Sequence, residues 1–232
     1  MKKKSLISAT LTAVVMLGFA SHASAALVDY SIDYTTSQGI VDNGSTWDTR
    51  NINIPGATSL SSIEVRLNID CEYNGDYYAY LRHGTTGFAV LLNRVGVTSS
   101  DSSGYADRGF FKVQFSDSAA NGDIHNYQSV FDPKGGSLTG KWQPDGRNVD
   151  PSSTDLTDRT AMLASFHDMN PNGDWTLFVA DDSTLGIGTL SGWGMTMTVD
   201  VAAVPEPAIS GVAAIAIVAL LCLLKRERNC RI

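Results

Sequence analysis

The sequence predicts an all-β fold, a β-sandwich or jelly roll. Two observations carry this prediction. Apolar residues alternate with polar ones over several short segments, which is the period of a strand with one buried and one solvated face. Clusters of Gly, Asn, Asp and Thr separate these segments, as expected of turns. Many short strands joined by such turns are typical of sandwiches and jelly rolls.

The clearest alternation covers residues 63–70, in which every second residue is Ile, Val or Leu. Alternation over 111–116 places Phe111, Val113 and Phe115 on one predicted core face. Denser apolar runs over 88–95 and 175–180 predict more central strands. The remaining predicted elements are strands at 77–82 and 195–201, turns at 74–76, 84–87, 121–123, 172–174 and 185–188, surface loops at 99–104 and 145–158, and one short helix or helical turn within 157–166.

Residues 26–203 are predicted to form one strongly acidic domain. They hold 22 acidic and 10 basic residues, whereas the whole chain has 24 and 17. A net charge of this sign repels phosphate backbones and no basic stripe offsets it, so nucleic-acid binding is excluded. Cys71 is the only cysteine of the segment, so no disulfide can form within it.

The N-terminal residues 1–25 are typical of a signal peptide. Lys2, Lys3 and Lys4 form a charged start, residues 6–19 an apolar core, and Ala23-Ser24-Ala25 a small-residue cleavage site. The segment therefore predicts export and cutting by signal peptidase before residue 26. The alternative, a membrane anchor, needs a longer apolar stretch of about 20 residues.

The C-terminal residues 204–232 combine three features. The first is the motif at 204–207, in which Pro205 and Pro207 flank Glu206 and keep the chain stiff and extended. The second is the run 208–224, which has 17 residues and no charge. The basic tail at 225–232 follows at once, which predicts a transmembrane helix with the tail in the cytoplasm and the acidic domain outside.

This arrangement resembles the PEP-CTERM sorting signal of Gram-negative bacteria. The resemblance implies that an exosortase-type processing enzyme recognises Pro205, Glu206 and Pro207 and removes the helix. The domain would then pass from the inner membrane to the cell surface or to an extracellular matrix of exopolysaccharide. A permanent C-terminal anchor is the alternative for the same residues.

Residues 170–197 carry a second resemblance. Gly173-x-Trp175-x-Leu177-x-Val179, then Asp181, Gly188-Thr189-Leu190 and Trp193 resemble the end of the P domain, or P/Homo B domain, of subtilisin-like proprotein convertases. Earlier stretches, at 75–76, 81–92 and 115–119, fit the same family. The resemblance implies a jelly-roll sandwich of the galactose-binding type. Trp175, Gly188 and Trp193 are its structural hallmarks. Large aromatic side chains at such places fill the core, and glycine allows a close approach of the backbone.

No catalytic residue is predicted, and the chain is expected not to be an enzyme. His83-Gly84-Thr85 is similar to the histidine motif of subtilisins, but the Gly-Thr-Ser-x-Ala context of their nucleophile is missing, as is a Gly-x-Ser-x-Gly elbow. His125 and His167 lack the spacing of metal ligands. The many acidic residues leave a pair of glycosidase carboxylates open, but no pattern in the sequence singles one out.

Calcium is the candidate cofactor. Of the 22 acidic residues in 26–203, 20 are aspartates, and short carboxylates on loops suit a cation that takes six to eight oxygen ligands. The P-domain resemblance makes Asp76, Asp117, Asp181 and Asp182 the candidate ligands. The alternative is that these aspartates cap turns. Residues 168–173 look like half of an EF-hand loop, but position twelve would be Val179.

Three functions follow from these observations. The leading one is an exported, non-catalytic surface or matrix protein. The second is a carbohydrate-binding module, suggested by Tyr73, Tyr77, Tyr78 and Tyr80 near one predicted hairpin, of which at least half should be buried. The third is an in-trans stabiliser or regulator of a subtilisin-like serine protease, by analogy with the convertases.

Overall fold

The structure is a computed structural model that describes residues 25–153 and 158–202. The predicted sorting signal and all of the signal peptide except Ala25 lie outside these residues. Within them, no helix has the length and apolar character needed to cross a membrane. The described residues form one compact unit.

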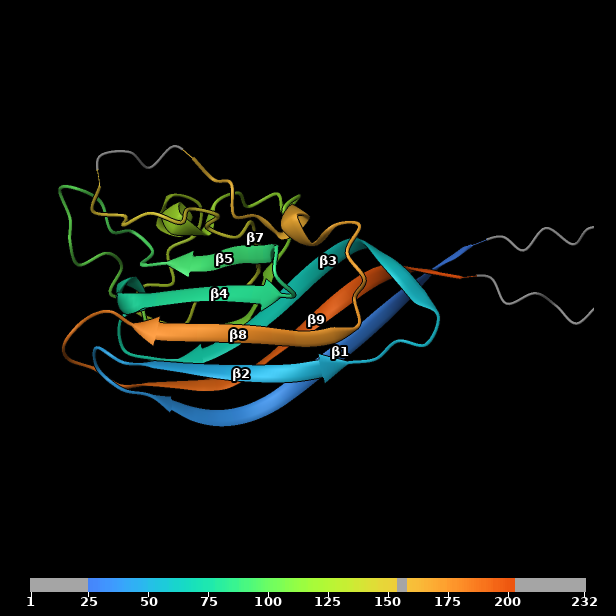
Figure 1. Cartoon of the computed structure of the whole chain (residues 1–232). Coiled ribbons are helices and arrows are strands. Elements are labelled where there is room, and N and C mark those ends of the chain that lie inside the picture. Colours follow the sequence, from blue (N-terminus) through green and yellow to red (C-terminus); the bar gives the residue numbers. More distant parts are fainter. Residues whose placement is uncertain (1–24, 154–157, 203–232) are drawn as a thin grey trace, which may run out of the picture. The chain divides into compact units, whose positions relative to one another are not determined.

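In the described part, two sheets contain nine strands (Figure 1). The five-stranded sheet has the order β1 (Ala26–Ile40), β9 (Gly188–Val201), β3 (Ala57–Asp70), β6 (Phe110–Phe115) and β7 (Lys141–Trp142). The four-stranded sheet has the order β2 (Ser45–Ile52), β8 (Gly173–Asp181), β4 (Tyr77–His83) and β5 (Gly87–Asn93). Three short 3₁₀ turns are η1 (Asn74–Asp76), η2 (Ile124–Ser129) and η3 (Leu163–Phe166). The all-β prediction is confirmed.

Neighbouring strands pair antiparallel, apart from the short parallel pair β6 and β7. Figure 1 shows β2, β8, β4 and β5 in one layer, with the long strands β1, β9 and β3 running obliquely to it. β9 lies between β1 and β3 over most of its length. The last strand therefore holds the first and third strands together, which makes the sheet depend on contacts between distant parts of the chain.

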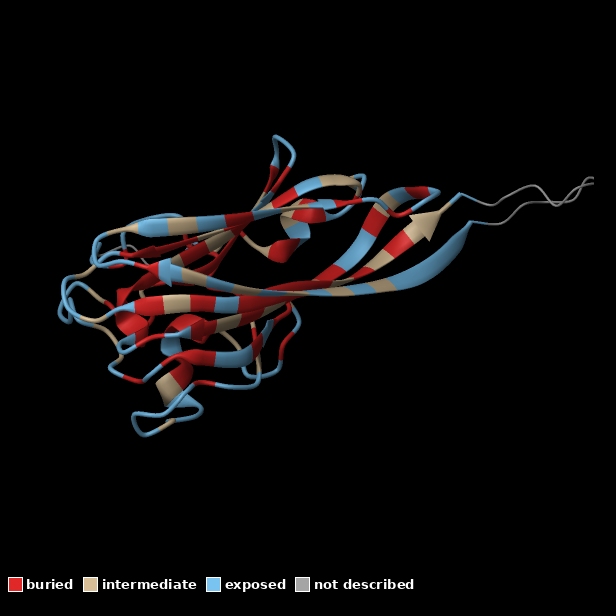
Figure 2. Cartoon of the chain, turned by 90° about the horizontal axis from the view of Figure 1, so that it is seen from below, coloured by how far each residue is buried: buried red, intermediate tan, exposed pale blue. Residues whose placement is uncertain are grey.

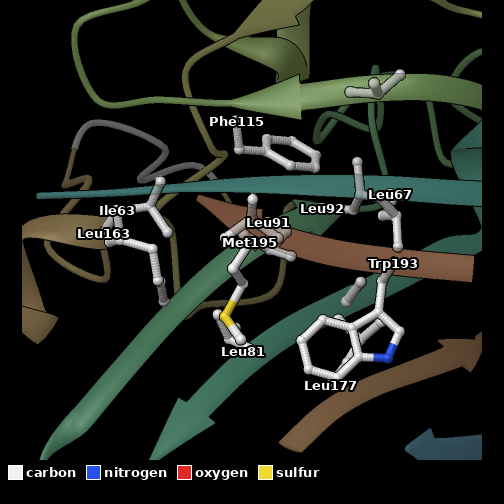
Figure 3. Packing of buried hydrophobic residues seen from close by; sticks show 14 of the residues in the cluster. Ile63, Leu67, Leu81, Leu91, Leu92, Phe115, Leu163, Leu177, Trp193 and Met195 are labelled. Carbon is white, nitrogen blue, oxygen red and sulfur yellow. The ribbon is translucent and has the colours of Figure 1, made fainter. Parts of the chain in front are cut away.

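The core lies between the two sheets. Leu67 and Met195 of the five-stranded sheet meet Leu81 and Leu177 of the four-stranded sheet, and all four are fully buried (Figure 3). Along the strands, buried residues alternate with exposed or half-buried ones (Figure 2). Both sheets thus bury one face each, which is the period-two pattern of the sequence realised in space.

Strands predicted from the sequence at 63–70, 77–82, 175–180 and 195–201 are confirmed. The run 88–95 forms a strand only as far as Asn93, and this strand, β5, lies at the edge of its sheet rather than in a more central place. Its dense burial comes from loop segments that cover the edge, where the Val90 N–H donates to the Ala161 carbonyl and the Asp145 N–H to the Leu91 carbonyl.

The predicted core face of 111–116 is wrong at one position. Phe111 is 55% exposed and Phe110 occupies the core instead. Lys112 has a φ of 52°, and the β3–β6 register shifts between Leu67 and Ile69, so a bulge interrupts the alternation there.

One other prediction needs correction. The segment 145–158 does not begin as a surface loop, since Asp145 is fully buried and Arg147 is 7% exposed. Buried ion pairs, described below, draw this end of the loop inward. The short helix or helical turn predicted within 157–166 is confirmed as η3, whose first backbone N–H groups donate to Asp117.

Candidate functional site

The three hallmark residues belong to the core. Trp175 of β8 is fully buried, and its indole Nε1 donates a hydrogen bond to the Pro171 carbonyl at 2.9 Å. Trp193 of β9 is 2% exposed and donates to Asp48 Oδ2 of β2 at 2.8 Å, which ties the two sheets together. A Cβ at Gly188 would lie 2.4 Å from the Tyr77 hydroxyl oxygen, so this position has no room for a side chain.

An acidic end of the sandwich is formed where β4 begins and β8 ends. Tyr77 pairs with Asp181 across the two strands, and its hydroxyl donates to Asp181 Oδ2 at 3.0 Å. The Asp182 backbone N–H donates to the Asp76 carbonyl at 2.9 Å. Asp76 is 8% exposed and Asp181 1%. Three of the four candidate calcium ligands therefore lie close together.

Burial and mutual repulsion leave the carboxyl groups of Asp76 and Asp181 poorly stabilised as anions. Burial, followed by the charge of Asp181, raises the pKa of Asp76 to about 6. Burial also raises the pKa of Asp181, and the charges of Asp42 and Asp182 add to this effect, although hydrogen bonds from Ser183 and Tyr77 oppose it. The acidic end thus takes up protons more readily than free aspartate does.

Asp117 does not join this group. Its carboxylate oxygens accept hydrogen bonds from the backbone N–H groups of Leu163 and Ala164 at 3.0 and 2.7 Å, as a cap of η3. Within residues 25–153 and 158–202, no three His, Cys, Asp or Glu side chains are grouped so that they could hold a metal ion. The four aspartates therefore do not fit a single calcium site through their side chains, and calcium binding stays a prediction.

His83 lies at the end of β4, beside the hairpin turn to β5, and is 5% exposed. Its ring stacks on Trp175, with centroids 4.1 Å apart and planes 5° apart. Nδ1 faces the Asp174 carbonyl at 2.9 Å and Nε2 faces the Asn170 carbonyl at 2.8 Å. Both ring nitrogens are engaged by the backbone, so the His-Gly-Thr sequence serves the packing of β4 against β8.

A buried ionic network, which the sequence did not reveal, holds η2 to the rest of the fold. His125 Nδ1 lies 2.7 Å from Asp145 Oδ2, and Nε2 lies 2.9 Å from the Val97 carbonyl. Arg147 bridges Asp145 and Asp123 at 3.0 and 2.6 Å. Burial lowers the pKa of His125, but the hydrogen bond and charge of Asp145 outweigh it and the net shift is upward. Single charged residues at irregular spacing give no sequence signal for such a network.

The outer surface of the four-stranded sheet carries a cluster of aromatic side chains that we call the aromatic face: Trp47, Tyr78, Tyr80, Phe88 and Phe178. The Tyr80 and Phe178 rings stack at 4.8 Å, and the Tyr80 and Phe88 rings lie 5.0 Å apart. A pocket of about 590 Å³ opens beside Tyr80. Of the four tyrosines singled out in the sequence, Tyr78 and Tyr80 lie on this face, Tyr77 is buried and Tyr73 is 40% exposed.

Comparison with protein families adds one match. Residues 133–197 match the family model of the proprotein convertase P-domain. The matched segment contains β7, η3, β8 and most of β9, and so contributes strands to both sheets. It also supplies the three tryptophans that are fully or almost fully buried, Trp142, Trp175 and Trp193.

Among solved structures, the chain is similar to a chain in the complex of the Aeromonas sobria serine protease and its chaperone. The sequence identity is 17% and the TM-score is 0.41, and the match covers 76% of this chain. It covers 28% of the other chain, so the present chain spans less than a third of that protein's length. No curated protein matches the chain significantly.

Proposed function

We propose that residues 26–203 form a non-catalytic P-domain-like jelly roll that binds and stabilises a separate subtilisin-like serine protease. The match of 133–197 to the P-domain family carries this proposal. The matched segment contributes strands to both sheets and contains all three buried tryptophans, so the likeness concerns the framework of the domain rather than one surface loop. The name of the matched family links such a domain to proprotein convertases.

The placement of the histidine side chains favours a stabilising role over a catalytic one. His83 is held between two backbone carbonyls, and His125 is paired with Asp145 inside the fold. Both histidines contribute to packing and to buried hydrogen bonds. A rigid domain of this kind stabilises a partner by mass action, because binding to the folded protease alone shifts its unfolding equilibrium.

The protease proposal is tested by affinity capture with the full-length chain as bait. The source bacterium's secreted and periplasmic proteins are labelled with a fluorophosphonate, which marks active serine hydrolases. We expect a labelled subtilisin-type protease to be retained, and its thermal inactivation to slow when purified bait is added. Heat-unfolded bait is the control. Retention of no labelled protein by folded bait contradicts the proposal, as does reproducible cleavage of peptides or glycans by the purified chain alone.

We also propose that the chain is exported and sorted through residues 204–232. The support is the sequence alone: the signal-peptide pattern, Pro205-Glu206-Pro207, the apolar run and the basic tail. Intact-mass analysis of the protein from membrane, surface and matrix fractions tests this. We expect a surface form that begins at residue 26 and lacks the helix. A full C-terminus in every fraction would instead identify a permanent anchor.

A further inference from the structure

The aromatic face is built by strands that are distant in the sequence. Trp47 of β2 lies opposite Phe178 of β8, and Phe178 lies opposite Tyr80 of β4. Phe88 of β5 extends the row through its contact with Tyr80. Adjacent strands lie about 4.8 Å apart, so a row across four strands spans roughly 14 Å. The register of three strand pairs thus assembles one continuous aromatic row.

These side chains point away from the core. Trp47 precedes the buried Asp48, and Phe178 lies between the fully buried Leu177 and Val179. Trp47 is 63% exposed, while the other four members of the aromatic face are half-buried against one another. The row is therefore one exposed ring beside four mutually packed rings that each keep part of their surface open to solvent. An apolar patch shared by adjacent strands is typical of an interaction site, whereas a ring that stands alone needs no explanation.

Polar groups lie beside the row, on the side of the sheet where the β4–β5 turn is. The 590 Å³ pocket is lined there by Arg82, Asn170 and Asp174 among others. Next to it, Asn51 Nδ2 donates to Asp174 Oδ1 at 2.7 Å. The Thr49 and Thr176 hydroxyls lie 2.9 Å apart on the same surface. The pocket and its neighbourhood are therefore rich in hydrogen-bonding groups: one guanidinium, one carboxylate, and several amides and hydroxyls. Their charges nearly cancel.

We propose that the aromatic face and the adjoining pocket bind a neutral polysaccharide. The C–H groups on the face of a pyranose ring pack on aromatic rings, whose π faces are electron-rich. The sugar hydroxyls at the rim of the ring need directional partners, which Arg82, Asp174 and the neighbouring amides supply. A row that crosses the whole sheet suits an extended polymer. The acidic domain repels polyanions, which is why an uncharged chain is the expected ligand.

Native gel electrophoresis in gels that contain a polysaccharide tests the proposal. The probes are mixed-linkage β-glucan, xyloglucan, galactomannan and dextran, with alginate as a polyanion. The full-length chain is purified in a detergent without a sugar headgroup. We expect at least one neutral polymer to retard the chain and to protect Trp47 from quenching by acrylamide. Trp47→Ala and Tyr80→Thr should each weaken retardation about tenfold.

Phe111→Ala is the matched control, because Phe111 is 55% exposed but belongs to the other sheet. It should bind as the parent chain does. The proposal is overturned if no neutral polymer retards the chain, if only alginate does, or if all three variants bind equally. If Trp47→Ala instead abolishes capture of the labelled protease and no polymer is bound, the aromatic face is a protein-docking surface. That result would leave the protease proposal standing and remove this one.

Discussion

Gly188 shows at the scale of one residue how closely the two sheets pack. A Cβ there would lie 2.4 Å from the Tyr77 hydroxyl, which donates to the buried Asp181. We expect Gly188→Ala to lower the free energy of unfolding by about 1–3 kcal/mol through overpacking. The measurement is urea denaturation followed by tryptophan fluorescence.

The neighbouring position on the paired strand provides the control. Gly39 of β1 pairs with Thr189, and an added Cβ there would meet nothing within 4 Å. Gly39→Ala should therefore be neutral or stabilise by up to about 1 kcal/mol, since alanine restricts the unfolded chain. Equal destabilisation by both substitutions would show that the contact with Tyr77 is not what excludes a side chain at Gly188.

Asp76 gives a residue-scale prediction with a definite sign in pH. Its pKa is raised to about 6 by burial and by Asp181, above the ordinary value near 3.8, so the folded state binds the proton more tightly. The anion therefore costs stability, and this cost grows as pH rises from about 4 to about 6. Asp76→Asn removes this anion and should therefore stabilise the fold by about 1–2 kcal/mol at pH 7.5. The effect is smaller than the full pKa shift would give, because solvent screens part of the repulsion.

The same variant should gain little at pH 4, because Asp76 is then protonated in the folded state and the cost of its buried anion has largely disappeared. Urea melts of parent and Asp76→Asn at pH 4 and pH 7.5 measure the difference. A gain that is equal at both pH values would mean that the substitution acts through packing, and a loss at pH 7.5 would mean that the carboxylate is needed as an anion.

At the scale of an element, His125 fixes η2. Both of its ring nitrogens face acceptors, the Asp145 carboxylate and the Val97 carbonyl, and both bonds form only when both nitrogens carry hydrogen. The raised pKa agrees with a protonated ring. Its stabilising effect is complete below the unfolded pKa of about 6.5 and is lost as pH rises through the higher folded value.

We therefore expect His125→Gln to destabilise most at pH 5.5, by about 2–3 kcal/mol, and less at pH 9. Guanidinium melts at the two pH values, with amide hydrogen exchange over 124–129, provide the readout. A loss that is independent of pH would show that the imidazole acts by shape alone.

The strands themselves were predictable wherever one face is buried without interruption. β3 from Ile63 onward, β8 as far as Val179 and the second half of β9 alternate, because each supplies every second residue there to the core. The same reasoning placed Phe111 in the core wrongly. The bulge at Lys112 interrupts the alternation, so that Phe111 faces solvent while Val113 is buried. β1 was missed because its inward residues, such as Tyr30 and Tyr34, are only half-buried and are separated by Ser, Thr and Asp.

The aromatic face could be predicted only in part, for a reason that belongs to the whole molecule. Tyr78 and Tyr80 were visible as neighbours in one strand. Trp47 and Phe178 join them only through the register of β2 with β8 and of β8 with β4. Sequence alternation gives the face of a strand but not its partner, so a site made across a sheet stays hidden until the topology is known.

The distribution of tryptophans gives a test of the whole fold. Trp142, Trp175 and Trp193 are at most 2% exposed, whereas Trp47 is 63% exposed. Acrylamide should therefore quench a minor, red-shifted part of the fluorescence, and Trp47→Phe should remove that part. If any tryptophan remained accessible in Trp47→Phe, the two sheets would not be packed as described.

Calcium binding is decided at the acidic end. If Asp76 and Asp181 ligate calcium, millimolar calcium raises Tm at pH 7.5, because a ligand of the folded state stabilises it. Asp76→Asn would then abolish the rise, while Asp117→Asn, which alters the cap of η3, would keep it. Magnesium and sodium at matched ionic strength are the controls. An unchanged Tm of the parent chain contradicts the calcium prediction and leaves these aspartates as turn and strand-end groups.

The pH dependence of the whole domain follows from these groups acting together. The raised pKa values of Asp76, Asp181 and His125 all mean that the folded state binds protons more tightly than the unfolded state does. Stability should therefore rise as pH falls from 8.5 to 5, and calorimetry should give a higher Tm at pH 5. Falling net charge acts in the same direction, since 22 acidic residues repel one another.

Salt separates the two causes, because it screens long-range repulsion between exposed charges but acts less on buried groups. In about 0.5 M NaCl the Tm difference should shrink but persist in the parent chain. It should fall further in the double variant Asp76→Asn, His125→Gln, which removes two of the three proton-binding groups. A difference that vanishes in salt for both proteins would assign the pH dependence to net charge, and a higher Tm at pH 8.5 would contradict the sign derived from all three groups.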